Sequence, residues 1–378
     1  MNNVSIVFSL SGFSATVSYQ VTLLSLTLLC YCLILVVNVS LILTIILDQN
    51  LHEPMYIFLC NLCINGLYGT AGFYPKFVFD LMSDIHIISY VGCFLQVFVI
   101  YSYATIDFSI LALMAYDRCV AICRPLEYHS VMSVRRIAVL VSLSWLVPLC
   151  CEVMVVTLTS TLKLCGSQIQ KLYCENWSIV KLACSTTIAN NIVGLIVISF
   201  YCGHVLFIVY SYVRLVKSAL KSREGRRKFM QTCVPHLFCL LNVTAALLFD
   251  VMYSRYGSAS VPQSVKNFMA IQFLIMPPIL NPIIYGLILT KIRYRMTTLY
   301  SVRGADTFSM FKRNPGFWAG PSRSFAVLLA PFPGCCCVIV IVVMIVVILC
   351  PPPYQKKHHS TGWWSDGEAG GVITRLVE

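Results

Sequence analysis

Long apolar runs separated by short polar stretches dominate this chain. Seven runs are long enough to cross about 30 Å of hydrocarbon as helices. Their expected bounds are residues 21–47, 55–80, 90–116, 136–158, 188–213, 229–254 and 265–289. Helix is the economical structure, because every backbone polar group must be paired internally in lipid. The alternation of a membrane barrel is missing, so the pattern predicts an all-α membrane protein with a bundle of seven transmembrane helices.

A further apolar stretch, residues 335–350, makes the C-terminal region atypical. It is just short of a usual span, and three prolines follow it. It is open to four interpretations: a crossing segment, a hairpin, a surface cap with palmitoylated cysteines, or an erroneous gene model. We expect an extracellular N-terminus over residues 1–20, the seven-helix domain over 21–296, a cytoplasmic tail over 297–334 and a disordered tail over 351–378.

The distribution of Lys and Arg predicts the orientation. The stretches after the third, fifth and seventh spans carry most of these residues, so they are expected in the cytoplasm. The N-terminus is then extracellular, and the motif Asn3-Val4-Ser5 provides a glycosylation site there. The first twenty residues lack a basic start and a small-residue cleavage site, so no cleaved signal peptide is expected.

Composition narrows the class of protein. The chain has 378 residues, of which 58% are hydrophobic and 11% charged, and its mean hydropathy is +0.80. A soluble domain of this size needs more charge on its surface. The net charge of +12 fits basic loops beside lipid, and basic patches with stacking aromatics for nucleic acid are missing. No phosphate-binding glycine loop or nucleophile–base pair indicates an enzyme, and no cofactor is expected.

The 19 cysteines do not indicate a disulfide scaffold, because most lie in apolar runs and act as small hydrophobes. Cys60 and Cys63 form a CxxC inside a span without a second pair, so no metal site is expected. Outside the spans, cysteines occur at four outer positions, where oxidation is expected. They are Cys93, Cys165, Cys174 and Cys184. Four cysteines allow three pairings, and spacing does not choose among them.

Several ordered motifs resemble one family. They are Pro54-Met55-Tyr56, "MAYDRCVAICRPL" from Met114 to Leu126, Ser211-Tyr212, Thr232-Cys233 with His236-Leu237, and "PILNPIIY" from Pro278 to Tyr285. Together they resemble the odorant (olfactory) receptors of the rhodopsin-like G-protein-coupled receptors. The stretch "INGLYGTAGFYPK" at Ile64–Lys76 is most similar to the fish branch.

The resemblance implies a receptor in the cell membrane. A small odorant would bind in an outer transmembrane pocket and activate a heterotrimeric G protein of the stimulatory, cyclic-AMP type. A non-olfactory rhodopsin-like receptor is one alternative. A membrane transporter is another, but it would predict internal repeats and interrupted helices, which the sequence does not show.

An ion pair at the end of the third span is the first candidate site. The resemblance implies that Asp117 restrains Arg118 in the inactive receptor and that Arg118 turns inward when a G protein docks. The alternative is a snorkelling arginine that only marks topology. Further residues are assigned to this switch by the resemblance. They are Tyr212, Asn281, Pro282 and Tyr285, of which Pro282 also breaks a helical hydrogen bond.

Asp107 is an acid well inside the third span, and such residues are functional candidates by default. Asn38 and Asn281 are its expected partners in a polar cluster. The family usually has an aspartate in the second span where this chain has Gly66. That departure favours a hydrogen-bonded cluster over a bound sodium ion.

The resemblance also implies the disulfides Cys93–Cys174 and Cys165–Cys184, and it places the ligand in the outer half of the third, fifth and sixth spans. The lining candidates are Ile100, Tyr101, Ala104, Thr105, Val197, Phe200, Leu247 and Val251. Glu152 and Asp250 admit two interpretations, contacts for a cationic ligand or water-facing acids near loop ends, and the second is favoured.

Overall fold

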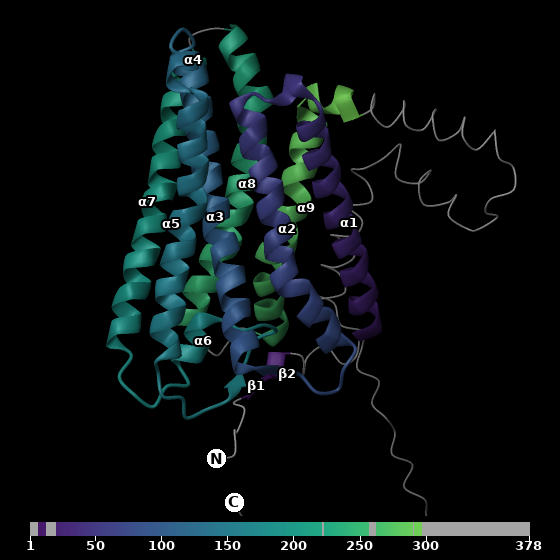
Figure 1. Cartoon of the computed structure of the whole chain (residues 1–378), viewed down its shortest axis with the longest axis vertical. Helices are drawn as coiled ribbons and strands as arrows, with labels where there is room; N and C mark the ends of the chain where they lie inside the picture. The colour runs from purple at the N-terminus through teal and green to yellow at the C-terminus, as the bar shows by residue number, and fades with distance from the viewer. Residues whose placement is uncertain (1–6, 13–19, 221–222, 257–261, 290, 297–378) are drawn as a thin grey trace, which may run out of the picture.

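A computed structural model describes residues 7–12, 20–220, 223–256, 262–289 and 291–296. Within these residues there are seven long helices, which run alternately up and down in one bundle (Figure 1). They are α1 (Gln20–Leu47), α2 (Pro54–Leu81), α3 (Tyr90–Cys123), α5 (Val134–Ser160), α7 (Ile188–Ala219), α8 (Arg223–Tyr256) and α9 (Gln263–Ile288). These are the seven predicted spans. The predicted segments 297–334, 335–350 and 351–378 lie outside the described residues, as do residues 1–6 and 13–19 of the predicted N-terminal segment 1–20, including Asn3.

Five of these helices, α1, α3, α5, α7 and α9, are long and apolar enough to cross a membrane. The other two, α2 and α8, have 28 and 34 residues, and the apolar part of α8 is the shorter stretch Leu237–Val251. In α2, Lys76 and Asp80 pair one turn apart, which lowers the cost of placing both charges near lipid. Length, hydropathy and the shared bundle together describe a multi-pass membrane protein.

The third helix forms the centre of the bundle. In its most apolar window 78% of the residues are buried, against 6% in α7, and α3 packs against α2, α5 and α7. Glycines permit its close approach to α2. A Cβ atom added at Gly69 would lie 2.3 Å from the Tyr103 ring, and one at Gly72 would lie 2.4 Å from Val99. Small residues at such contacts are the usual route to tight helix packing in membranes.

A small sheet closes one end of the bundle, here called the sheet end. Strand β1 (Val7–Leu10) pairs antiparallel with β2 (Ile87–Ser89) and parallel with β3 (Gln168–Ile169). The loop over residues 162–187, here called the lid, contains β3 and the short helix α6 (Asn176–Val180). The N-terminal segment is therefore part of this cover, which hydropathy alone did not predict.

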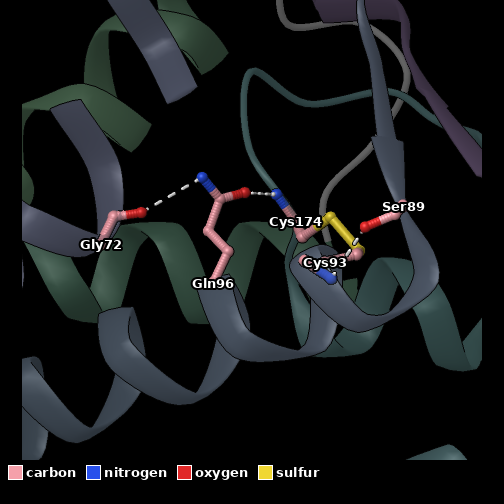
Figure 2. The surroundings of a disulfide bond; sticks show 6 residues. Gly72, Ser89, Cys93, Gln96 and Cys174 are labelled. Carbon is pink, nitrogen blue, oxygen red and sulfur yellow. Dashed lines mark hydrogen bonds between the residues drawn. A yellow bond between two sulfur atoms is a disulfide. The ribbon is translucent and has the colours of Figure 1, made fainter. Parts of the chain in front are cut away.

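Two disulfides hold the lid in place. Cys93 at the start of α3 bonds to Cys174, and Cys165 bonds to Cys184; these are the pairs that the resemblance implied. Figure 2 shows Gln96 beside the first bond. Its amide accepts a hydrogen bond from the Cys174 backbone N–H at 2.9 Å and donates to the Gly72 carbonyl at 3.4 Å. The lid is thus joined through α3 to α2.

The opposite end, here called the α4 end, holds the 3₁₀ turn η3 (Gln49–Leu51), the short helix α4 (Tyr128–Val131) and a helical turn over residues 291–296. Ion pairs attach this turn to the stretch between α1 and α2. Lys291 contacts Glu53 at 2.8 Å, and Arg295 contacts Asp48 at 2.7 Å. In the described residues no disulfide lies at this end.

Candidate functional site

The predicted Asp117–Arg118 pair forms near the end of α3, at the α4 end. The Arg118 Nε donates to Asp117 Oδ2 at 2.9 Å, and a second guanidinium nitrogen contacts the same oxygen. Asp117 is fully buried, and the Arg118 side chain is 15% exposed. A charge-assisted contact of this kind is about twice as strong as a neutral hydrogen bond, so Asp117 can hold Arg118 in this position.

Tyr128 completes this arrangement. It begins α4, and its hydroxyl donates to Asp117 Oδ1 at 2.8 Å. Both carboxylate oxygens of Asp117 are therefore engaged. Burial and the neighbouring Asp117 raise the pKa of Tyr128, which keeps the phenol protonated and able to donate. We call Asp117, Arg118 and Tyr128 the arginine lock. Sequence reasoning missed Tyr128, although it lies close behind the motif that ends at Leu126.

The two tyrosines assigned to the active state lie near the lock. Both are buried. The Tyr212 hydroxyl on α7 donates to the Cys233 carbonyl of α8 at 3.3 Å, and Tyr285 lies on α9. Tyr212 and Tyr285 belong to one hydrophobic cluster, and Tyr128 of the lock packs against the same cluster. The lock thus faces α7 and α9 across the interior of the bundle.

The polar cluster differs from the expected one. Asn38 donates to the Pro278 carbonyl at 2.7 Å and to the Ile34 carbonyl. Pro282, four residues after Pro278, has no N–H to give that carbonyl, so Asn38 satisfies a group that the helix itself cannot. Asn38 therefore supports the proline kink of α9.

Asp107 takes a different partner. Asn65 on α2 donates to its carboxylate at 3.4 Å and to the Tyr103 carbonyl at 3.0 Å. Among the described residues, no hydrogen bond joins Asp107 to Asn38 or Asn281, so the expected three-residue cluster was wrong in its contacts. Asn281 is buried on α9. The sequence placed Asn65 beside Gly66, but helix rotation decides which of two neighbours points to α3.

Under the lid lies a second concentration of charge. Lys171 of the lid contacts Asp250 of α8 at 2.6 Å and Glu175 at 3.5 Å. The Tyr173 hydroxyl donates to the other Asp250 oxygen at 3.1 Å. Burial by itself lowers the pKa of Lys171, but Glu175 and Asp250 outweigh it and the pKa is raised. Lys171 is therefore a stable cation that ties the lid to α8.

The interpretation of Glu152 and Asp250 as water-facing acids was wrong. Glu152 is 4% exposed and Asp250 is 3% exposed. Hydropathy showed that both lie near the ends of spans, but it could not show that the lid covers Asp250. Glu152 lies on the buried face of α5, which also carries Ser144, Pro148 and Thr159, so its side chain points into the bundle.

One lining candidate was also wrong. Phe200 on α7 is 45% exposed and packs on its own helix against Tyr201 and His204. One residue along an α-helix turns the side chain by about 100°, and Tyr201, whose buried hydroxyl lies beside Thr105, takes the inward direction.

The other candidates are distributed over three helices. Ile100, Ala104 and Thr105 are buried on α3, where Tyr101 is half-buried. Val197 on α7 is half-buried, as are Leu247 and Val251 on α8.

Comparison with known proteins decides the family. The family described as olfactory receptor matches residues 27–303. The chain belongs to the olfactory receptor family. Olfactory receptor 1D2 of Pongo pygmaeus is 34% identical over 288 residues, which are 74% of this chain and 90% of that protein. Olfactory receptor 10H4 of Homo sapiens is 34% identical over 291 residues, with 74% and 90% covered.

A third relative, olfactory receptor 2A7 of Mus musculus, is 34% identical over 294 residues, with 76% and 93% covered. This olfactory receptor is therefore a G-protein-coupled receptor and not an enzyme, and the predicted family and seven-helix fold are confirmed. The three relatives are mammalian, and the expected fish-type character stays a prediction.

Proposed function

We propose that this receptor binds a small odorant near the sheet end and activates a heterotrimeric G protein of the stimulatory type, which raises cyclic AMP. The sheet end faces the outside of the cell and the α4 end faces the cytoplasm. The Lys and Arg residues of the loops after α3 and α7 support this orientation, because positive charge concentrates on the cytoplasmic side. The N-terminus is then extracellular, and Asn3 is a glycosylation site.

The arginine lock is the observation that carries the proposal. Asp117 holds Arg118 through two contacts, and Tyr128 holds Asp117 from the other side. Removing one partner of a buried ion pair leaves an uncompensated charge and costs about 3–5 kcal/mol. A G protein that docks at this end supplies new contacts for Arg118, which then turns toward Tyr212 and Tyr285. The lock is the bistable element that the partner shifts.

The α8 helix connects the two ends in this mechanism. Near the sheet end it carries Asp250, which is tied to the lid. Near the α4 end its Cys233 carbonyl accepts from Tyr212. An odorant among the α3 and α8 candidates, under the lid, would change the position of α8 and thereby the helix contacts around Arg118. Because Asn281 and Pro282 lie on α9, beside Tyr285, the kink there belongs to the same moving region.

Asp107 has a supporting role in this proposal. It lies in the bundle interior between the two ends and is hydrogen-bonded to Asn65. We expect Asp107→Asn to alter basal signalling or surface expression, measured in transfected cells with an epitope tag. If both quantities match the wild type, Asp107 plays no part in the transition.

The test of the proposed function uses an odorant panel and a cyclic-AMP reporter in transfected cells. We expect the wild type to respond to at least one odorant and Arg118→Ala to lose the response while reaching the cell surface. Arg135→Ala is the matched control, because Arg135 is exposed at the same end, and it should retain the response. An Arg118→Ala receptor that signals like the wild type would contradict the proposal.

A further inference from the structure

Glu152 is the buried titratable residue that the proposed function leaves without a role. It is an acid about two helical turns before the end of α5 at Ser160 and is more than nine-tenths buried. Within the described part of the chain, no hydrogen bond or ion pair involves its side chain. A buried, uncompensated carboxylate is costly and is retained mainly where a partner completes it.

Helices α2, α3 and α7 pack against α5, and each carries a tyrosine within electrostatic range of Glu152. These are Tyr68 of α2, Tyr101 of α3 and Tyr201 of α7. The Tyr68 hydroxyl is hydrogen-bonded to Ser102 at 2.8 Å. Faces of tyrosine rings attract cations. The surroundings of Glu152 are therefore suited to a positive charge.

The neighbouring charges favour the same sign of ligand. Tyr101 also interacts electrostatically with Glu175 and Asp250, which share Lys171. Among the described residues around Tyr101, the acids Glu152, Glu175 and Asp250 therefore outnumber the one base, Lys171. Two further basic residues of this region have other partners. Arg255 lies over the Trp177 ring at 4.5 Å, and Lys181 donates to the Ser254 carbonyl at 2.7 Å.

We infer that the receptor's odorants are small protonated amines, whose ammonium group pairs with Glu152 among the rings of Tyr68, Tyr101 and Tyr201. The inference rests on the proposed function, since it names the ligand class of the proposed odorant site. An anionic odorant would meet excess negative charge. A neutral alcohol would leave Glu152 buried without a counter-charge. Asp250 is a poorer partner for the amine, because Lys171 and Tyr173 already occupy it.

Binding is tested separately from signalling. Purified receptor in lipid nanodiscs at pH 7.4 is titrated with two amines and their uncharged isosteres: heptylamine against 1-heptanol, and 2-phenylethylamine against 2-phenylethanol. Thermal stabilisation of the receptor reports binding. We expect at least one amine to bind tenfold or more tightly than its alcohol. Equal binding within both pairs, or no stabilisation by any probe, overturns the inference.

Variants of Glu152 test whether the amine binds at this residue. Glu152→Gln should weaken amine binding at least tenfold and abolish the preference over the alcohol. Asp84→Asn removes an exposed acid near the same end and should change neither. If Glu152→Gln folds and keeps the amine preference, Glu152 is not the counter-ion and the inference fails. If this variant does not fold, Glu152→Asp, which keeps the charge but shortens its reach, must lower the preference, and an unchanged preference overturns the inference.

The same preparation separates the two proposals. Nucleotide exchange on an added stimulatory G protein is measured with each probe. Amines that bind but never promote nucleotide exchange would contradict the proposed function but would still support the inferred ligand class. Alcohols that bind better than amines and promote nucleotide exchange would contradict the inferred ligand class but would still support the proposed function.

Discussion

The two ends of the bundle are held in different ways. The sheet end has two disulfides, a three-stranded sheet that includes the N-terminal strand, and the Lys171 contacts to Glu175 and Asp250. At the α4 end the described ties are hydrogen bonds and ion pairs, chiefly the arginine lock and the Lys291 and Arg295 pairs. Covalent and sheet contacts resist rearrangement, whereas single ion pairs can exchange partners. Conformational change is therefore expected at the α4 end.

The largest effect should come from the first disulfide. Replacing both Cys93 and Cys174 by Ser should cost about 2–5 kcal/mol, seen as lower thermal stability and lower surface expression. The pair Cys165 and Cys184 closes 19 residues of chain instead of 81. In the chain-entropy account its removal should cost about 1 kcal/mol less. Equal losses, or a larger loss for the second pair, would show that loop closure does not set the rigidity of the sheet end.

Lys171 should have the next largest effect. Lys171→Met leaves Glu175 and Asp250 without their shared cation and should cost about 2 kcal/mol of stability. Lys163→Met removes an exposed lysine of the same lid and should cost almost nothing. Thermal unfolding of the purified receptor measures both. If the two variants unfold alike, the tie between the lid and α8 does not contribute to the difference between the ends.

Tyr128→Phe should act on activity more than on stability. It removes one hydrogen bond to Asp117 and so loosens the arginine lock by about 1–2 kcal/mol. Basal cyclic AMP should rise several-fold at equal surface expression. Tyr210→Phe changes an exposed tyrosine on α7 and should leave basal signalling unchanged. Lower basal signalling in Tyr128→Phe would mean that Tyr128 serves the active state instead.

Lys291→Gln should have the smallest effect. The Lys291–Glu53 pair is exposed on both sides, and such pairs contribute about 0–1 kcal/mol. The hydrogen bond to Glu53 raises the pKa of Lys291. A lysine whose pKa is higher in the folded state than in the unfolded state stabilises the fold. This stabilisation is complete at a pH below the unfolded-state pKa of 10.5, and it is lost only as the pH rises through the folded-state pKa. The difference from wild type should thus stay constant between pH 6 and pH 9.

The helices were predictable from the sequence, and their ends less so. The predicted third span stops at residue 116, but α3 continues to Cys123. The helix continues because its backbone hydrogen bonds need no apolar side chains, whereas hydropathy reports only the part in lipid. The strand Val7–Leu10 was missed because its partners, β2 and β3, lie far away in the sequence.

The residues of the candidate sites were also predictable only in part. Asp117 and Arg118 are neighbours in the sequence, so a motif was enough to predict their pairing. Tyr128, Asn65 and Lys171 become partners of distant acids only through folding. The errors at Phe200 and Asn38 came from helix rotation and from a proline on another helix. A hydropathy profile contains no information on helix rotation or on contacts with a residue of another helix.

The direct test of the central claim is the basal nucleotide-exchange rate of a stimulatory G protein with purified Asp117→Asn receptor and no odorant. The neutral amide removes the charge that holds Arg118 while keeping its shape. We predict a basal rate several-fold above wild type, and no further increase when Tyr128→Phe is added, because both changes open the same lock. A basal rate at or below that of wild type would contradict the claim that Asp117 restrains Arg118.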